Sequence, residues 1–172
     1  ATVAQYQAAM ASVSYANSSE NPNTLDRTVS FGVNDGALDS AVATSIVTVT
    51  AENDAPTVVA VGTARYVENV AATVINAALT LSDVDDTNLE SASVAITGGF
   101  LAGEDSLSFT NQNDITGNYD ATTGILALSG TATVAQYQAA MASVSYANSS
   151  ENPNTLDRTV SFGVNDGALD SA

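Results

Sequence analysis

The sequence predicts an all-β protein, in which antiparallel sandwiches of two sheets are repeated in tandem and each repeat carries one short helix. Three observations support this fold class. The chain contains a long internal duplication, short segments in which apolar and polar residues alternate, and turn residues between those segments. Hydrophobic residues make up 45% of the 172 residues, which is too many for a disordered acidic chain.

The duplication defines the repeat. Residues 1–41 recur letter for letter as residues 132–172, an offset of 131 residues (132 minus 1). This period exceeds the roughly 20 to 50 residues of solenoid repeats, so each repeat is expected to be a whole domain with its own core. We expect residues 1–53 to be the C-terminal part of one repeat, and residues 54–172 to be the next repeat without its final strand. In a complete repeat that strand would correspond to residues 42–52.

Short segments with period-two alternation follow one another between turns rich in Gly, Asn and Asp. About seven strands in a unit of this length is typical of an immunoglobulin-like sandwich, whose two sheets bury their inward-facing rows. The alternating apolar sets are Val29 with Phe31 and Val33, Val47 with Val49, Leu79 with Leu81, Val94 with Ile96, Leu107 with Phe109, Leu126 with Leu128, and Val144 with Tyr146.

One segment departs from the strand pattern. Thr133 followed by Gln136 has the spacing of a capping box, and apolar residues then recur at helical spacing. This predicts a short helix over residues 134–142 and an identical helix over residues 3–11. We expect its apolar stripe to pack across the open end of the sandwich rather than to bind a partner. The stripe consists of Val134, Tyr137 and Met141.

The charge balance excludes several partners. The chain has nineteen acidic residues, three basic ones and a formal net charge of −16, and it has no Cys, Trp or His. Arg27, Arg65 and Arg158 are isolated, so the clustered positive charge that nucleic acid requires is missing. The same sign disfavours an anionic membrane surface, and no apolar run indicates direct membrane insertion. A folded surface this negative repels itself unless it binds cations, which favours a divalent metal as a structural partner.

Oxygen-bearing residues gather at turns in short runs. Calcium takes roughly six to eight oxygen ligands, and Asp-x-Asp in an extended loop directs both carboxylates to one side. Transition metals are disfavoured because the chain has no His or Cys. The Asn-Asp-Gly runs are equally typical of ordinary hairpin turns. The runs are Glu52-Asn53-Asp54-Ala55-Pro56, Asp83-Val84-Asp85-Asp86, and the repeated Asn34-Asp35-Gly36 and Asn165-Asp166-Gly167.

The order of these motifs resembles the end of a cadherin repeat. Leu25-Asp26-Arg27 leads into an alternating strand, and Asn53-Asp54-Ala55-Pro56 resembles the calcium-binding cadherin linker. Tyr66-Val67-Glu68-Asn69 is similar to the early Glu-Asn motif, and Asp83-Val84-Asp85 to the later Asp-x-Asp motif. Segments similar to residues 128–138 recur in the cadherin-like repeats of giant bacterial surface adhesins. The chain therefore resembles those repeats, of the RTX-adhesin extender type.

The resemblance implies calcium as the cofactor and suggests its ligands. Thr28 stands where cadherins have a glutamate and Ala51 where the linker has its first aspartate, so fewer or weaker ions are expected than in an animal cadherin. The ligands implied at the junction of the two repeats are Asp26, Glu52, Asn53, Asp54, Asp83, Asp85 and Asp166, with Asp35 as the first-copy counterpart of Asp166. Glu68 and Asp157 would serve the junction at the other end of the second repeat.

Some acidic residues receive no such role. Asp39 and Asp86 are left unassigned. The loop at Glu104 and Asp105, and the turn at residues 111–114, are expected to be solvated surface.

We expect no enzyme activity. Without His, Cys or Lys, only carboxylate pairs remain for acid-base chemistry, as in glycosidases. Those pairs lie in short loops of a small sandwich, which lacks the deep cleft such catalysis requires.

The expected function is that of an extracellular, cell-surface spacer, which packs against neighbouring repeats of its own chain and needs only stiff domains. A repeated carbohydrate- or ice-binding module is one alternative, although Thr44, Thr48 and Thr50 form only a short ladder. The other alternative is a homo-oligomeric fibre or sheath, in which strands pair between chains at the edge left open by the missing strand.

Overall fold

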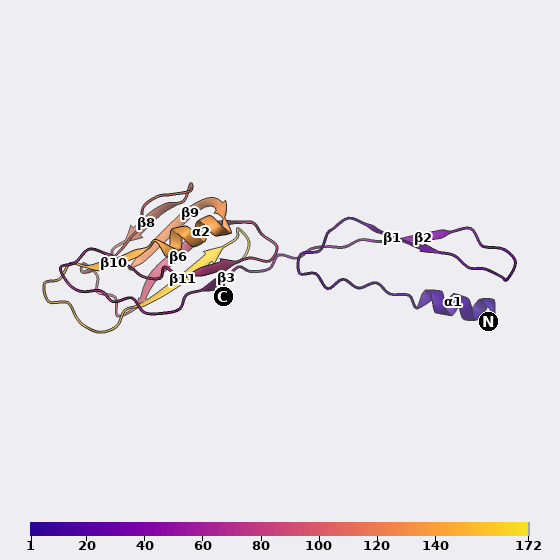
Figure 1. The fold of residues 1–172 in the computed structure, drawn as a ribbon, viewed down its shortest axis with the longest axis horizontal. Helices are drawn as coiled ribbons and strands as arrows, with labels where there is room; N and C mark the ends of the chain where they lie inside the picture. Colours follow the sequence, from indigo (N-terminus) through magenta and orange to yellow (C-terminus); the bar gives the residue numbers. More distant parts are fainter. Residues whose placement is uncertain (172) are drawn as a thin grey trace. The chain divides into compact units, whose positions relative to one another are not determined.

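The computed structural model describes residues 1–171 and divides them into two compact units, with the boundary between Glu52 and Asn53 (Figure 1). All of the paired strands in this range are antiparallel, and two nine-residue helices accompany them. The all-β prediction with one short helix per repeat is therefore confirmed. No helix among these residues is long and apolar enough to cross a membrane.

The first unit consists of a helix and a hairpin. Helix α1 (Val3–Ala11) begins at a capping box formed by Thr2 and Gln5. Strands β1 (Arg27–Phe31) and β2 (Ala43–Val47) pair in antiparallel register. None of the side chains in this unit is buried, so the hairpin has no core of its own.

The second unit contains two main sheets and a short two-stranded pair. Its two longest strands, β6 (Asn88–Gly98) and β9 (Ile125–Thr133), bury apolar side chains in alternation with exposed or half-buried ones. The first sheet has the order β11 (Thr159–Asn165), β6 (Asn88–Gly98), β9 (Ile125–Thr133) and β8 (Thr116–Asp120). The second has the order β4 (Thr73–Val74), β10 (Ser145–Asn148) and β7 (Asp105–Ser108), and β3 (Thr57–Val59) pairs with β5 (Thr80–Ser82).

The core of this unit lies between the sheets. Strands β6 and β9 are paired so that Ala92 lies opposite Leu128 and Val94 opposite Leu126, and these four side chains are buried together. Leu107 from β7 joins the same apolar cluster from the other sheet. This arrangement is that of an antiparallel sandwich, in which inward-facing rows from two sheets form one core.

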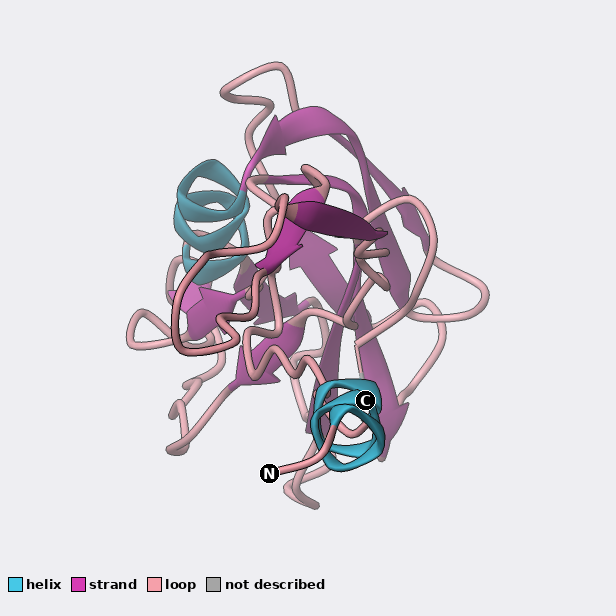
Figure 2. Cartoon of the chain, turned by 90° about the vertical axis from the view of Figure 1, so that its right-hand side faces the viewer, coloured by secondary structure: helices cyan, strands magenta, loops and turns pink. Residues whose placement is uncertain are grey.

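The predicted helix is present as α2 (Val134–Ala142), which follows β9 directly (Figure 1). Figure 2 shows the helices in cyan and the strands in magenta. Thr133 and Gln136 form the expected capping box. Tyr137 and Met141 from the predicted stripe are fully buried, and the Tyr137 hydroxyl donates a hydrogen bond to the Gly130 carbonyl at 2.6 Å. Packing of the helix against β5, β6 and β9 covers one end of the core.

The same four-residue sequence adopts different structures in the two units. Ser145–Asn148 forms β10 because it lies between β4 and β7, which satisfy its backbone on both sides. Residues 14–17 have the same sequence and form no strand. Strand formation here therefore depends on neighbouring strands more than on local propensity.

One sequence-based expectation about the surface is wrong. Asp105 was expected in a solvated loop, but it lies at the start of β7 and is only 3% exposed. Its carboxylate accepts hydrogen bonds from the Tyr146 hydroxyl, from Asn148 Nδ2 at 2.7 Å and from the Leu101 backbone N–H at 2.8 Å. Arg158 Nε completes the set at 3.2 Å from Asp105 Oδ2. Asp105 is two residues before the buried Leu107, so strand alternation directs its side chain inward.

Candidate metal centre

Three aspartates lie together in the loop between β5 and β6. One carboxylate oxygen from each of Asp83, Asp85 and Asp86 lies within 4.8 Å of the others, and we call this group the Asp triad. Within residues 1–171 it is the only cluster of at least three His, Cys, Asp or Glu side chains close enough to share a metal ion. The triad can therefore hold a metal ion.

Local sequence explains how the triad forms. Leu81 is buried in β5 and Leu89 is buried in β6, so the residues between them must form a tight connection at the end of the core. Asp83 Oδ1 accepts hydrogen bonds from the backbone N–H groups of Asp85 at 3.2 Å and Asp86 at 2.9 Å. This Asx-type turn curls the chain around the Asp83 carboxylate and brings the other two carboxylates beside it.

The chain entering the second unit contacts the same group. The backbone N–H of Asp54 donates to Asp85 Oδ2 at 3.0 Å. Asn53 Nδ2 donates to Asp166 Oδ2 at 2.8 Å, and Pro56 is buried two residues after Asp54. Residues at the start of the unit and in the turn after β11 are thus tied to the triad loop.

Electrostatic repulsion inside the cluster is visible in the pKa of Asp86. Burial raises that pKa, and the negative charges of Asp83, Asp85 and Asp166 raise it further. Asp166 behaves in the opposite way, because burial raises its pKa but hydrogen bonds from Leu169 N–H, the Asn53 amide and Ala168 N–H lower it more. The negative charges of the cluster thus repel one another at Asp86, and a bound cation would relieve that repulsion.

One oxygen of the triad has no donor. Asp83 Oδ2 is buried and accepts no hydrogen bond from the part of the chain that the structure describes. A buried carboxylate oxygen without a donor is costly, and a bound cation removes that cost. The donor set is made entirely of oxygens, which suits hard divalent cations and not zinc or copper.

The structure brings together five of the residues that the sequence predicted as ligands: Asn53, Asp54, Asp83, Asp85 and Asp166. It adds Asp86, which the sequence left unassigned. The signal for Asp86 was its position directly after Asp83-Val84-Asp85, where an Asx-type turn brings the third carboxylate back to the first.

The other predicted ligands lie elsewhere. Asp26, Asp35 and Glu52 belong to the first unit, and all three are exposed. The Asp35 carboxylate accepts from the backbone N–H groups of Ala37 and Leu38, which lowers its pKa and closes the turn between β1 and β2. In the second unit Glu68 and Asp157 are also exposed and are not part of the triad. Their role as ligands stays a prediction.

Comparison with known proteins gives one significant match among curated proteins. The chain is 36% identical over 100 residues to halomucin of Haloquadratum walsbyi, a stretch that covers 55% of this chain and 1% of halomucin. No protein-family profile matches the chain, and no solved structure matches it. This chain therefore spans a very small part of the length of that relative.

Proposed function

We propose that this chain is a structural, non-catalytic spacer of a large extracellular surface protein, in which cadherin-like repeats are stiffened by calcium. The repeats would hold a binding domain away from the cell and would pack against neighbouring repeats of the same chain. The observation that carries the proposal is the Asp triad, where three carboxylates converge and the buried Asp83 Oδ2 has no donor within the described residues.

Calcium is favoured over magnesium by the number of protein oxygens available. Magnesium usually keeps several waters and takes one or two carboxylates, whereas calcium accepts roughly six to eight oxygens in flexible geometry. The triad supplies three carboxylates. Two further aspartates are near it, because the Asp54 backbone N–H donates to Asp85 and the charge of Asp166 acts on Asp86. The motif order resembling cadherin linkers supports the same ion.

Stiffening would come from ordering the chain at the start of the second unit. Asn53 and Asp54 are hydrogen-bonded to Asp166 and Asp85, and Pro56 restricts the backbone of the residue before it. Without a cation the carboxylates repel one another and oppose these contacts. With calcium bound they become ligands of one ion, so the linker is held to the unit.

The similarity to halomucin supports a place on the cell surface, because mucin-type proteins belong outside the cell. The net charge of −16 fits a surface exposed to salt, where cations are abundant. Letter-for-letter repetition supports a structural role, since a spacer gains length from identical copies.

The proposal is tested by calorimetric titration of calcium and, separately, magnesium into the chain. We expect calcium to bind and magnesium to bind more weakly. The Asp83→Asn/Asp85→Asn variant should lose calcium binding, while Glu104→Gln/Glu151→Gln, which removes two charges outside the triad, should keep it. Equal calcium binding by both variants would rule out the Asp triad as the site.

A further inference from the structure

The duplicated sequence contains one Asn-x-Ser/Thr motif in each copy. The two motifs are Asn17-Ser18-Ser19 and Asn148-Ser149-Ser150, and no other asparagine of the 172 residues is followed two positions later by Ser or Thr. Asn-x-Ser/Thr is the acceptor sequence of N-glycosylation in secreted proteins. Residues 12–21 and 143–152, which surround the two motifs, are identical. The chain therefore presents one acceptor sequence in two structural settings.

The local turn at the acceptor is the same in both copies. Asn17 Oδ1 accepts a hydrogen bond from the Ser19 backbone N–H at 2.8 Å. Asn148 Oδ1 accepts the equivalent hydrogen bond from the Ser150 backbone N–H at 2.9 Å. This Asx turn joins the asparagine to the residue whose hydroxyl completes the motif. A difference in reactivity between the copies must then come from their surroundings.

The surroundings of the first copy leave it open. Asn17, Ser18 and Ser19 are all exposed. Asn17 Nδ2 donates to the hydroxyl of Tyr15 at 3.3 Å, and Tyr15 is itself exposed. Water or an enzyme can replace this contact at little cost, because both groups already lie at the surface.

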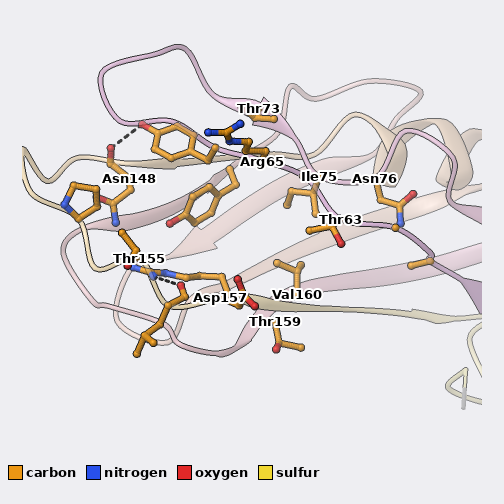
Figure 3. Close-up of a pocket in the computed structure, with 18 of the residues that line it drawn as sticks. Thr63, Arg65, Thr73, Ile75, Asn76, Asn148, Thr155, Asp157, Thr159 and Val160 are labelled. Carbon is orange, nitrogen blue, oxygen red and sulfur yellow. Dashed lines mark hydrogen bonds between the residues drawn. The ribbon is translucent and has the colours of Figure 1, made fainter.

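Tertiary structure closes the second copy. Asn148 is only 6% exposed, and its Nδ2 donates to Asp105 Oδ1 at 2.7 Å in the interior. Its backbone carbonyl accepts from the Tyr66 hydroxyl at 2.9 Å, which is the dashed contact beside Asn148 in Figure 3. Asn148 borders the pocket of about 620 Å³ in that view, but it contributes almost no exposed surface there. The backbone N–H of Ser149 is also bonded, to the Glu104 carbonyl at 2.9 Å.

Glycosyl transfer requires access to the same nitrogen. Nδ2 of the asparagine bonds to the anomeric carbon of a sugar while the bond from that carbon to a lipid diphosphate breaks. The lipid diphosphate leaves with the bonding electrons, and Nδ2 gives a proton to a base of the transferase. In the folded second unit Nδ2 of Asn148 is held against Asp105. A close-packed interior has no free volume for a sugar, so the folded unit is closed to this reaction.

We propose that Asn148 is an N-glycan acceptor that is open only while the second unit is unfolded, and that its modification keeps the unit unfolded. The ligand is an oligosaccharide from a lipid-diphosphate donor. A sugar on Nδ2 cannot be accommodated beside Asp105, so the modified chain cannot rebuild the contact between β7 and β10 at these residues. Irreversible modification of the unfolded state also draws further folded chains into it.

The consequence is a mark of folding failure. A repeat that folds before it meets the transferase carries no glycan at this position, whereas a repeat that stays unfolded acquires one. The proposal needs an exported chain, as the proposed function does. Calcium binding at the Asp triad is measured separately, so failure of this proposal would leave the proposed function standing.

The test uses the whole chain, a purified single-subunit oligosaccharyltransferase and a lipid-linked oligosaccharide. Trypsin cuts after arginine and so places Asn17 and Asn148 in different peptides, 1–27 and 66–158, whose glycan occupancy is measured by mass spectrometry. A synthetic peptide of residues 143–152 should be glycosylated. In the folded chain the initial rate at Asn148 should be at least about tenfold lower than at Asn17, because only a small unfolded fraction is open.

A destabilised variant tests the dependence on folding. Leu128→Ala removes a buried side chain from β9 and leaves both acceptor sequences intact. The reaction is run at a temperature where circular dichroism shows the second unit unfolded in this variant and folded in the parent. The variant should then be modified at Asn148 as fast as at Asn17. The matched control, Leu128→Ala with Ser150→Ala, should lose modification at Asn148 and keep it at Asn17.

Refolding tests the second half of the proposal. On cooling, the unmodified Leu128→Ala chain should refold, whereas the chain glycosylated at Asn148 should not. Equal rates at Asn17 and Asn148 in the folded parent would overturn the proposal, because burial would then give no protection. An unreactive peptide, an unmodified Asn148 in the unfolded variant, or refolding of the glycosylated chain would overturn it as well.

Discussion

Arg158 Nε lies 3.2 Å from Asp105 Oδ2 inside the second unit, where the two side chains are 10% and 0% exposed. It is the only ion pair between a basic and an acidic side chain in residues 1–171. The Arg158 guanidinium also donates from Nη1 to the backbone carbonyls of Asn154 and Leu156. The pair thus joins the start of β7 to the loop that leads into β11.

Replacing Asp105 with Asn should destabilise the second unit strongly. Arg158 would lose its partner in the interior, and removing one member of a buried pair typically costs about 3–5 kcal/mol. Urea unfolding should show this loss. The matched control is the neighbouring Glu104→Gln, which should change the unfolding free energy by less than about 0.5 kcal/mol. Equal effects of the two substitutions would contradict the role of the pair.

Protonation of Asp105 should contribute to the unfolding of the second unit in acid. Burial raises the pKa of Asp105, but hydrogen bonds from Tyr146, Asn148, Leu101 N–H and Arg158 lower it more, so its pKa lies below the ordinary value. A depressed carboxyl pKa gives stability that is present above about pH 4, the unfolded value, and is lost as pH falls toward the folded pKa.

The measurement is the unfolding free energy between pH 7 and pH 2.5. The slope below about pH 4 should be flatter in Asp105→Asn than in the parent chain, because this carboxyl no longer takes up a proton on unfolding. Parallel curves would show that other carboxyls account for the acid sensitivity.

The duplication provides an internal control for the packing of helix α2, because helix α1 has the same sequence. Tyr137 is fully buried and donates to the Gly130 carbonyl, whereas Tyr6, at the same place in the first copy, is 52% exposed. Tyr137→Phe should cost about 1–2 kcal/mol, because it removes the hydrogen bond to the part-buried Gly130 carbonyl. Tyr6→Phe should have no measurable effect in the same unfolding experiment. A comparable loss from both would mean that the two helices have similar surroundings.

Local signals were enough to predict the helices and most of the core. The capping box at Thr133 and Gln136 depends on residues three apart, and it forms in both copies whether or not the helix is buried. Strands were harder to predict from the sequence where most of their side chains are polar. Strand β8 (Thr116–Asp120) has only Tyr119 as a large apolar residue, and its structure depends on pairing with β9.

The candidate site was predictable in part for the same reason. Asp83 and Asp85 were recognised because they are two residues apart in a loop. Contact between that loop and Asn53 or Asp166 required the cadherin resemblance, since no local pattern joins residues so far apart in sequence. Two adjacent acids, Glu104 and Asp105, predict solvated surface, but strand alternation places Asp105 with the core.

Neutralising Asp86 should have opposite effects with and without calcium. Its pKa is raised by burial and by Asp83, Asp85 and Asp166, so at neutral pH its ionised form opposes folding. In chelator, Asp86→Asn should therefore raise the melting temperature. In calcium the same variant should gain less stability from the ion than the parent does. Thermal unfolding in both conditions measures this, and a variant less stable than the parent in chelator would contradict the electrostatic argument.

The last prediction concerns stiffness. The Asp83→Asn/Asp85→Asn variant keeps oxygen acceptors at both positions, so the turn hydrogen bonds to Asp83 Oδ1 and the Asp54 hydrogen bond to Asp85 can remain. Only the charge for holding a cation is removed. Calcium at about 100 times its dissociation constant should stabilise the parent by about 2.7 kcal/mol and should not stabilise the variant.

Small-angle scattering should report the mechanical consequence. In calcium the parent should have a longer and better-defined maximum dimension than in chelator, because the ion holds residues 53–56 to the second unit. The variant should show the chelator profile in both solutions, whereas Glu104→Gln/Glu151→Gln, which carries the same net charge, should respond as the parent does. If the parent has the same maximum dimension and the same melting temperature in calcium as in chelator, the ion does not stiffen the chain. Carboxylates that bind no cation cannot restrain the linker.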